Sequence, residues 1–169
     1  LGLKPNEHEH KVMGLAPYSK PEYFKNVISI FKTFQTVRGT KFVYKNKPKD
    51  LFFYVKDKLE GQRFDSIAAG LQSYTDDLII RWVKNCIKKT KAKNICLAGG
   101  VGLNVKTNML ISKISKDINL FVPPSPDDSS QAMGACYGYY LSESKKMILK
   151  KVKPIKHAYL GPEVNLEMV

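Results

Sequence analysis

The chain has 169 residues, 43% of them hydrophobic, so it can bury one sizeable core and suits one domain or part of a larger one. We find no signal peptide and no apolar run near the ~20 residues that a membrane-spanning helix needs, so we expect a cytoplasmic protein without a membrane partner. The formal charge of +13 comes mostly from lysine, but aromatic residues do not interleave the lysine runs and arginine is scarce. This pattern does not favour a nucleic-acid partner.

The first half of the chain has two segments with a recognisable pattern. Residues 21–34, PEYFKNVISIFKTF, have the spacing of an amphipathic helix. Residues 40–55, TKFVYKNKPKDLFFYV, predict two short strands around a turn at residues 46–48. We assign no chemistry to this part of the chain.

The middle of the chain has the clearest order. Apolar residues recur at spacings of three and four over residues 65–89, which predicts a long helix whose start Asp65 could cap. Next come a short apolar strand at 94–98, a helix at about 102–115 and a second short strand at 119–122. This order is typical of an α/β layer with parallel strands.

Three cysteines, Cys86, Cys96 and Cys136, stand far apart in the sequence without a C-x-x-C pair. Each lies in an apolar setting. We therefore expect buried, reduced thiols, as in a cytoplasmic protein.

Both ends of the chain predict a fragment of a larger protein. There is no initiator methionine, and the opening LGLKP reads as the tail of an apolar element. The closing YLGPEVNLEMV reads as the start of a new segment.

A strand runs into Gly99 and Gly100 in the segment CLAGGVGLN, and a helix follows. Glycines there allow a ligand to approach the backbone closely, and amide groups at a helix start can hold a phosphate. The spacing matches neither of the two best-known nucleotide-binding fingerprints, so a plain turn is the alternative interpretation.

The second strand leads into PPSPDDSS, where prolines end the strand and Asp127 or Asp128 begins a helix. One aspartate can cap that helix, which leaves the second carboxylate for a ligand. In an open α/β sheet, ligands bind beyond the carboxyl ends of the strands, where both turns lie. Metal ligation and simple capping are both open on spacing alone.

Five segments in order resemble one known family. They are NEHEHKVMGLAPYS at 6–19, IAAGLQ at 67–72, CLAGGVGLN at 96–104, VPPSPDDSSQAMGA at 122–135 and YLGPE at 159–163. The chain resembles the O-carbamoyltransferases, such as those that modify nodulation factors, tobramycin and cephamycin. The resemblance extends over nearly the whole chain.

The resemblance implies an α/β fold of the actin-like ATPase (ribonuclease H-like) class, a lobe with a mixed sheet flanked by helices. It implies that residues 1–157 are the second part of an N-terminal domain whose first lobe is largely missing, and that 158–169 begin a linker to a missing C-terminal domain. It also implies ATP-dependent transfer of a carbamoyl group from carbamoyl phosphate, through carbamoyladenylate, to a substrate hydroxyl, with a bound Fe(II) ion. By itself the fragment is expected to be inactive.

The resemblance also implies roles for single residues. Asp128 corresponds to the metal-binding and catalytic aspartate, and Lys11, in a loop near the cleft, is a second catalytic candidate. Gly99, Gly100 and Asn104 correspond to the nucleotide turn, and we group Ser129 with these cofactor-binding residues. The other metal ligands of the family belong to an upstream His-x-x-x-His motif, which this chain lacks.

Some residues depart from the family pattern. Ser130 and Ser19 stand where the family usually has glycine, and Gly102 stands where alanine is usual. His8 and His10 have the wrong spacing to replace the missing pair, and we interpret them as surface residues. Two other functions therefore stay open: a non-catalytic nucleotide-binding or interaction module, and a transferase similar to the tRNA threonylcarbamoyl enzymes.

Overall fold

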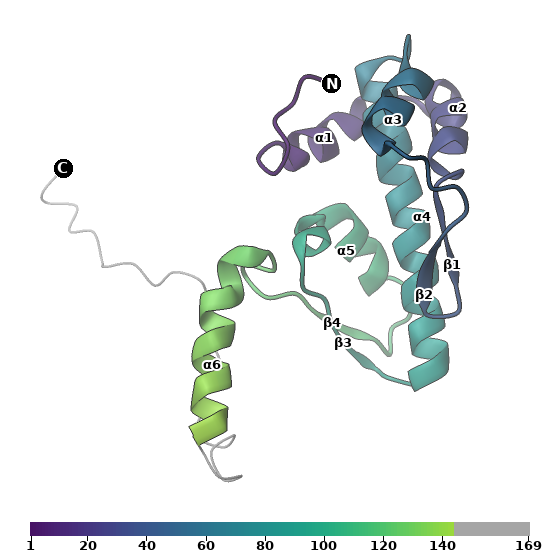
Figure 1. Cartoon of the computed structure of the whole chain (residues 1–169). Helices are drawn as coiled ribbons and strands as arrows, with labels where there is room; N and C mark the ends of the chain where they lie inside the picture. Colours follow the sequence, from purple (N-terminus) through teal and green to yellow (C-terminus); the bar gives the residue numbers. More distant parts are fainter. Residues whose placement is uncertain (144–169) are drawn as a thin grey trace, which may run out of the picture.

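The computed structural model describes residues 1–143 (Figure 1), so the expected boundary at residue 157 and the segment 158–169 lie outside the described residues. Its central element is helix α4, Phe64–Thr90, which has 27 residues and matches the long helix predicted at 65–89. At a rise of 1.5 Å per residue, α4 is about 40 Å long. Most of the other described elements pack along its sides (Figure 1).

Helix α4 begins differently from the prediction. The N-cap is Arg63, and Asp65 lies inside the first turn, where it accepts two hydrogen bonds from the Arg63 guanidinium at 3.1 and 2.9 Å. These hydrogen bonds hold the pKa of the Asp65 carboxyl below its ordinary value. At the other end, Lys91 adopts the left-handed conformation with φ of 59° and its N–H caps the helix. Within residues 1–143 no helix, α4 included, is long and apolar enough to cross a membrane.

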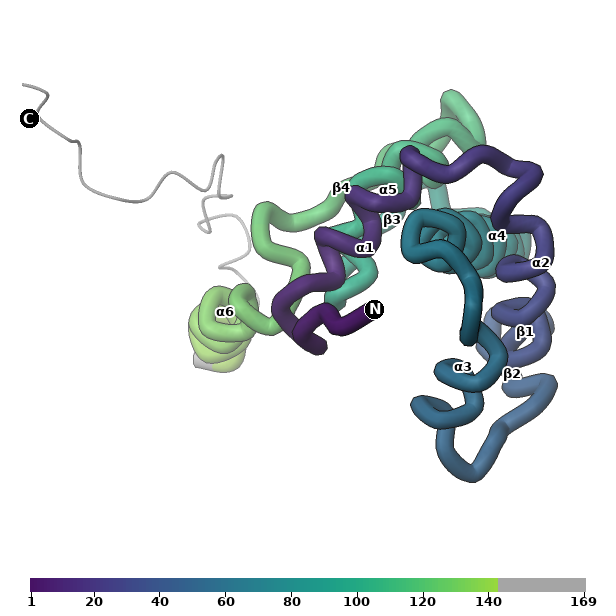
Figure 2. The backbone as a smooth tube through the Cα atoms, turned by 90° about the horizontal axis from the view of Figure 1, so that it is seen from above, coloured from purple at the N-terminus to yellow at the C-terminus, as the bar shows by residue number. Residues whose placement is uncertain are grey.

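The elements of the N-terminal half of the chain lie on both sides of α4 (Figure 2). Its elements are α1 (Glu9–Leu15), the 3-10 helix η1 (Ala16–Tyr18), α2 (Pro21–Phe31), β1 (Gln35–Arg38), β2 (Lys41–Tyr44) and α3 (Leu51–Leu59). Strands β1 and β2 form an antiparallel hairpin through the turn at Gly39, whose φ of 58° favours glycine.

The prediction of two strands around residues 46–48 is half wrong. Residues 41–44 do form a strand, but it pairs with β1, and residues 51–59 are helical. Asp50 caps α3 by accepting a hydrogen bond from the Phe53 amide at 3.0 Å. Tyr54, Val55 and Leu59 then pack against the core at helical spacing.

The C-terminal half lies on the same side of α4 as α1, opposite α2 and the β1–β2 hairpin (Figures 1 and 2). Its elements are β3 (Asn94–Cys96), η2 (Gly100–Leu103), α5 (Val105–Ser112), β4 (Asn119–Phe121), η3 (Asp128–Ser130) and α6 (Gln131–Glu143). Strands β3 and β4 are parallel, with Cys96 opposite Phe121, so the predicted parallel pair is confirmed. The single helix predicted at 102–115 is instead divided into η2 and α5 by Asn104, which caps α5.

The fold is therefore α/β, although the expected sheet has a different form in the described part. Residues 1–143 hold two separate sheets of two strands each, one antiparallel and one parallel, rather than one mixed sheet. Helix α6 extends away from the rest of the described chain (Figure 1).

Three hydrophobic clusters surround α4, and the helix contributes to each of them. Tyr74 and Leu78 pack with α2 and Phe34, Ile79 and Val83 pack with Leu97 and Ile111, and Ala68 and Ala69 pack with Ala16 of η1. Because one helix shares all three clusters, both halves of the chain depend on its position.

The expectation of three buried cysteines is wrong. Cys86 is half-buried in α4, while Cys96 and Cys136 are exposed, and all three thiols are free. Strand β3 is covered on one face only, with Ile95 half-buried and its neighbours exposed, so Cys96 points to the uncovered face. Cys136 lies on α6, whose side chains are mostly exposed.

The tight contact between α2 and α4 at Gly70 predicts the effect of one substitution. A Cβ at Gly70 would lie 2.6 Å from Val27 Cγ1 and 3.3 Å from the Ile28 backbone nitrogen, which would force α2 away from α4. We expect Gly70→Ala to lower the free energy of unfolding by about 1–3 kcal/mol, as overpacked cores do. Urea denaturation of the full chain measures this change.

Gly14→Ala is the matched control, because Gly14 is also helical but has open space around its Cβ position. Alanine there should leave stability unchanged or raise it by up to about 1 kcal/mol. Equal losses in both variants would contradict the tight α2–α4 contact.

Candidate functional site

The two turns singled out in the sequence lie side by side. Strands β3 and β4 run parallel, so the Gly-Gly turn and the Asp-Asp loop leave the sheet at the same edge. The Gly99 amide donates a hydrogen bond to the Pro126 carbonyl oxygen at 2.6 Å. A Cβ at Gly102 would lie 2.8 Å from Pro126 Cβ, so the alanine usual at this position would not fit the present spacing.

The Gly-Gly turn has the open backbone expected of a ligand-binding turn. Gly99 has a φ of 97°, a conformation that L side chains rarely adopt, and neither Gly99 nor Gly100 has a neighbour near its Cβ position. The turn continues into η2, where the Asn108 amide group donates to the Gly102 carbonyl oxygen at 2.7 Å. The buried Asn108 Oδ1 has no hydrogen-bond partner among the described residues.

The two aspartates have separate roles. Asp127 caps the 3-10 helix η3, because its Oδ1 accepts hydrogen bonds from the Ser125 hydroxyl at 2.8 Å and the Ser129 amide at 3.2 Å. Asp128 is exposed, and its carboxylate accepts a hydrogen bond from the Gln131 side chain at 3.1 Å. The expectation that one carboxylate serves the helix start and the other stays accessible is therefore confirmed.

Ser129 and Ser130 belong to the same loop. The Ser130 hydroxyl donates to the Asp127 carbonyl oxygen at 3.0 Å, so its side chain turns back onto the loop. The loop thus accommodates a serine at the position where the family usually has glycine. Ser129 is exposed, and its amide supports the Asp127 cap.

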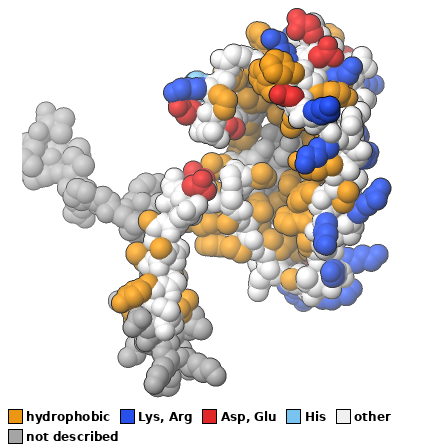
Figure 3. All heavy atoms as spheres, viewed as in Figure 1, with side chains coloured by type: hydrophobic (Ala, Val, Ile, Leu, Met, Phe, Trp, Pro, Cys, Tyr) orange, Lys and Arg blue, Asp and Glu red, His pale blue; other side chains and the backbone are white. Residues whose placement is uncertain are grey.

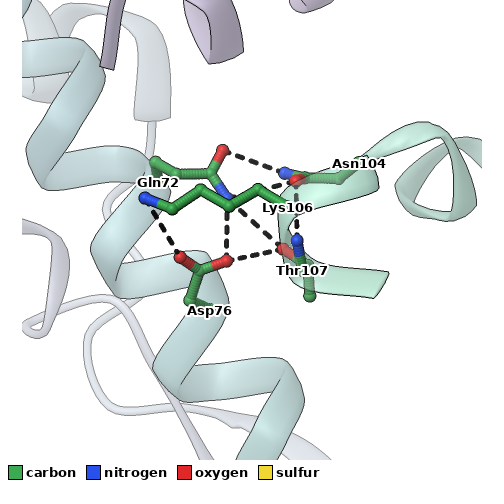
Figure 4. Close-up of polar contacts among 5 residues, drawn as sticks. All are labelled: Gln72, Asp76, Asn104, Lys106 and Thr107. Atoms are coloured by element: carbon green, nitrogen blue, oxygen red, sulfur yellow. Dashed lines mark hydrogen bonds and ion pairs between the residues drawn. The ribbon is translucent and has the colours of Figure 1, made fainter. Parts of the chain in front are cut away.

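Asn104 belongs to a buried polar network between α4 and α5 (Figure 4). Its Oδ1 accepts hydrogen bonds from the Thr107 amide and from Gln72 Nε2, both at 3.1 Å, and its Nδ2 donates to Gln72 Oε1 at 3.0 Å. These contacts use the whole carboxamide. Asn104 therefore supports the Gly-Gly turn by fixing where η2 ends and α5 begins.

Asp76 lies at the centre of this network. Its Oδ1 accepts hydrogen bonds from the Thr107 hydroxyl and from Gln72 Nε2, both at 2.7 Å, and Lys106 Nζ lies 3.7 Å from its Oδ2 (Figure 4). Asp76 is only 8% exposed and Thr107 is fully buried. A buried carboxylate is stabilised only when it is paired and hydrogen-bonded, as this one is.

A cleft of about 240 Å³ opens beside Asp76 and Lys106. Its other wall comes from η1 and the start of α2, including Ala16, Pro17 and Ser19. The motif KVMGLAPYS therefore lies against α4, where the Ser19 and Ser66 hydroxyls are 3.1 Å apart. Four of the segments that carry the family resemblance meet around α4 and the two turns.

Sequence reasoning missed four members of this site: Gln72, Asp76, Lys106 and Thr107. A signal was present, because Gln72 and Asp76 are four residues apart on one face of a helix that is otherwise apolar there. The hydrophobic spacing of α4 gave no reason to single out a polar pair, and their partners on α5 are over thirty residues away.

The remaining predicted residues lie apart from these contacts. Lys11 is exposed on α1. Within residues 1–143 its side chain forms no hydrogen bond or ion pair with either of the two turns. His8 occupies the N-cap position of α1 without a side-chain capping hydrogen bond, and its Nδ1 accepts a hydrogen bond from the Lys4 amide at 3.0 Å, while His10 is exposed on the helix. Within residues 1–143 no three His, Cys, Asp or Glu side chains lie close enough to hold a metal ion.

The buried network predicts a loss of stability in Thr107→Val. Valine keeps the shape of the side chain but removes the hydroxyl that Asp76 accepts from and that Gln72 contacts. We expect the free energy of unfolding to fall by about 1–3 kcal/mol, because a buried polar group loses its partner. Ser112→Ala on the same helix removes an exposed hydroxyl and should have almost no effect in the same denaturation experiment.

The capping role of Asp127 predicts its titration. The hydrogen bond from the Ser125 hydroxyl lowers the pKa of Asp127, so the charged form stabilises the loop above the ordinary Asp pKa and this contribution is lost as pH falls through the lowered value. Carboxyl-detected NMR should show that the pKa of Asp127 lies below that of an ordinary exposed aspartate. Ser125→Ala should move its pKa upward, and an unchanged pKa in this variant would contradict the assigned cause.

Comparison with known proteins finds the same family that the sequence motifs indicated. Residues 1–137 match the family described as Carbamoyltransferase N-terminus. The uncharacterized protein sll1178 of Synechocystis is 30% identical over 99% of this chain, and the uncharacterized protein MJ1051 of Methanocaldococcus jannaschii is 29% identical over 99%. Nodulation protein NolO of Bradyrhizobium diazoefficiens is 29% identical over 75% of the chain.

The aligned regions cover 30%, 31% and 24% of these three relatives, so the chain spans less than a third of their length. The family match extends from the first residue into α6 and contains η1, α4, both turns and the buried network. The chain belongs to the carbamoyltransferase family, in its N-terminal region.

Proposed function

We propose that this protein transfers a carbamoyl group from carbamoyl phosphate, through carbamoyladenylate made with ATP, to the hydroxyl of a small-molecule acceptor. The observation that carries the proposal is the meeting of the Gly-Gly turn and the Asp-Asp loop, joined by the hydrogen bond from Gly99 to Pro126. Because the chain belongs to the carbamoyltransferase family, we infer that the reaction at these two loops is carbamoyl transfer.

The Gly-Gly turn would hold the phosphate of the adenylate. Gly99 and Gly100 leave the backbone open to a ligand, η2 begins at Gly100, and α5 follows η2. Asn104 would keep the turn in place through Gln72 rather than contact the nucleotide with its side chain. Backbone positions fixed in advance are suited to holding charge that develops in a transition state.

Asp128 would act where the carbamoyl group is transferred. Its carboxylate is exposed beside the turn, while Asp127 holds the loop. A divalent metal such as Fe(II) would polarise the carbamoyl carbonyl, with Asp128 as one ligand. The described residues offer one such carboxylate, so the other ligands would have to come from another part of the protein.

Charge also favours an anionic donor. The net charge of +13 raises the local concentration of carbamoyl phosphate and ATP around the protein. Lys106, next to Asp76 at the cleft, and Lys11 on α1 are cations that could contact these substrates in the complete protein.

The test is Asp128→Asn in the complete protein, with product formation from carbamoyl phosphate and ATP as the readout. We expect transfer to fall by about a hundredfold or more, because asparagine cannot supply the negative charge. Thermal unfolding should be unchanged, since Asp128 is exposed and caps no helix.

Asp117→Asn is the matched control, an exposed aspartate in the loop before β4. Normal turnover in Asp128→Asn would exclude Asp128 from the reaction. ATP binding without turnover by the unmodified complete protein would instead favour a non-catalytic nucleotide-binding module.

A further inference from the structure

A second cleft lies on the opposite side of α4 from the turns, between the tip of the β1–β2 hairpin and the C-terminal half of the helix. It has a volume of about 650 Å³, and its charged lining consists of Arg38, Lys41, Lys88 and Lys89. Figure 3 shows Lys and Arg side chains along this edge of the molecule. We call these four residues and the space between them the basic cleft.

The positive charge of the basic cleft is not balanced within the described chain. All four side chains belong to exposed residues, and none of them forms an ion pair within residues 1–143. Asp77, on the same helix, is already paired with Arg81 at 3.0 Å. The lining contains no acidic residue.

Fold stability accounts for only part of this charge. Lys88 and Lys89 lie in the last turn of α4, where cations interact favourably with the helix dipole. Arg38 and Lys41 gain no such stabilisation from a helix dipole, because they lie in the hairpin, directly opposite each other. Like charges at directly opposed strand positions destabilise a hairpin, so this pair does not contribute to the stability of the hairpin.

The hairpin is fixed in place over the helix. The Trp82 indole N–H donates to the Thr40 carbonyl oxygen at 3.1 Å, and the Asn85 side chain donates to the Gly39 carbonyl oxygen at 2.7 Å. Phe42 also packs on Trp82, with ring centroids 5.2 Å apart. The backbone that carries Arg38 and Lys41 is therefore held next to Lys88 and Lys89 before a ligand binds, which lowers the part of the entropic cost of binding that comes from the backbone.

We propose that the basic cleft binds the polyphosphate group of a small ligand. The volume lies within the range of small-molecule sites, and the four cations that line this open hollow suit a compact anion with several negative charges. A nucleic acid fits less well, because the lining has no aromatic residue on which bases could stack, and the β2 aromatics are engaged with Trp82 and Lys47.

The test is calorimetric titration of the full chain with inorganic tripolyphosphate at low ionic strength. We expect Lys88→Ala/Lys89→Ala and Arg38→Ala/Lys41→Ala each to raise the dissociation constant by about tenfold. The matched control is Lys113→Ala/Lys116→Ala, which removes two exposed lysines at the end of α5 and should leave binding almost unchanged. Thermal unfolding checks that all variants are folded.

Three results would overturn the proposal. An equal loss in the control would mean attraction by net charge alone. A single-stranded oligonucleotide of matched charge that bound as tightly as tripolyphosphate would make a nucleic acid the partner. Unchanged binding in both cleft variants would place the anion elsewhere, and none of these outcomes bears on Asp128, because the two sites share no residue.

Discussion

The structure depends on the burial of α4 along most of its length. Its first turns pack against η1, its middle against α2 and Phe34, and its second half against β3 and α5. Each contact is ordinary hydrophobic packing, but together they make one helix the shared wall of every cluster among the described residues. A shift of α4 would therefore disturb the cleft at η1, the polar network and the basic cleft together.

The buried polar network turns this packing into a defined geometry. Apolar contacts alone would hold α5 against α4 with little preference for one register. The hydrogen bonds among Asp76, Gln72 and Thr107 favour one register of α5 on α4. A shift of α5 along α4 would leave the Asp76 carboxylate buried without a partner. Since Asn104 joins the network at the N-cap of α5, the register of two helices also sets the position of the Gly-Gly turn.

The two proposed sites use α4 in different ways. On one side, parallel strands bring the Gly-Gly turn and the Asp-Asp loop to one edge, and the helix supplies the polar support. On the other side, the helix fixes the hairpin through Trp82 and Asn85 and places its own lysines beside the hairpin cations. A rigid central helix can serve both because neither site needs it to move.

The sequence by itself determined the elements with strong local patterns. The long helix and the two short parallel strands followed from hydrophobic spacing and from glycine and proline positions, whereas capping chemistry predicted one capping aspartate without deciding between Asp127 and Asp128. The helical state of residues 51–59 was missed, because the run of aromatic residues after Asp50 has strand propensity while the cap and packing favour a helix. Only the tertiary structure decided the partners of Gln72 and Asp76, the exposure of Cys96 and Cys136, and the place of the hairpin cations beside Lys88. These depend on contacts between residues far apart in the chain, which no local pattern encodes.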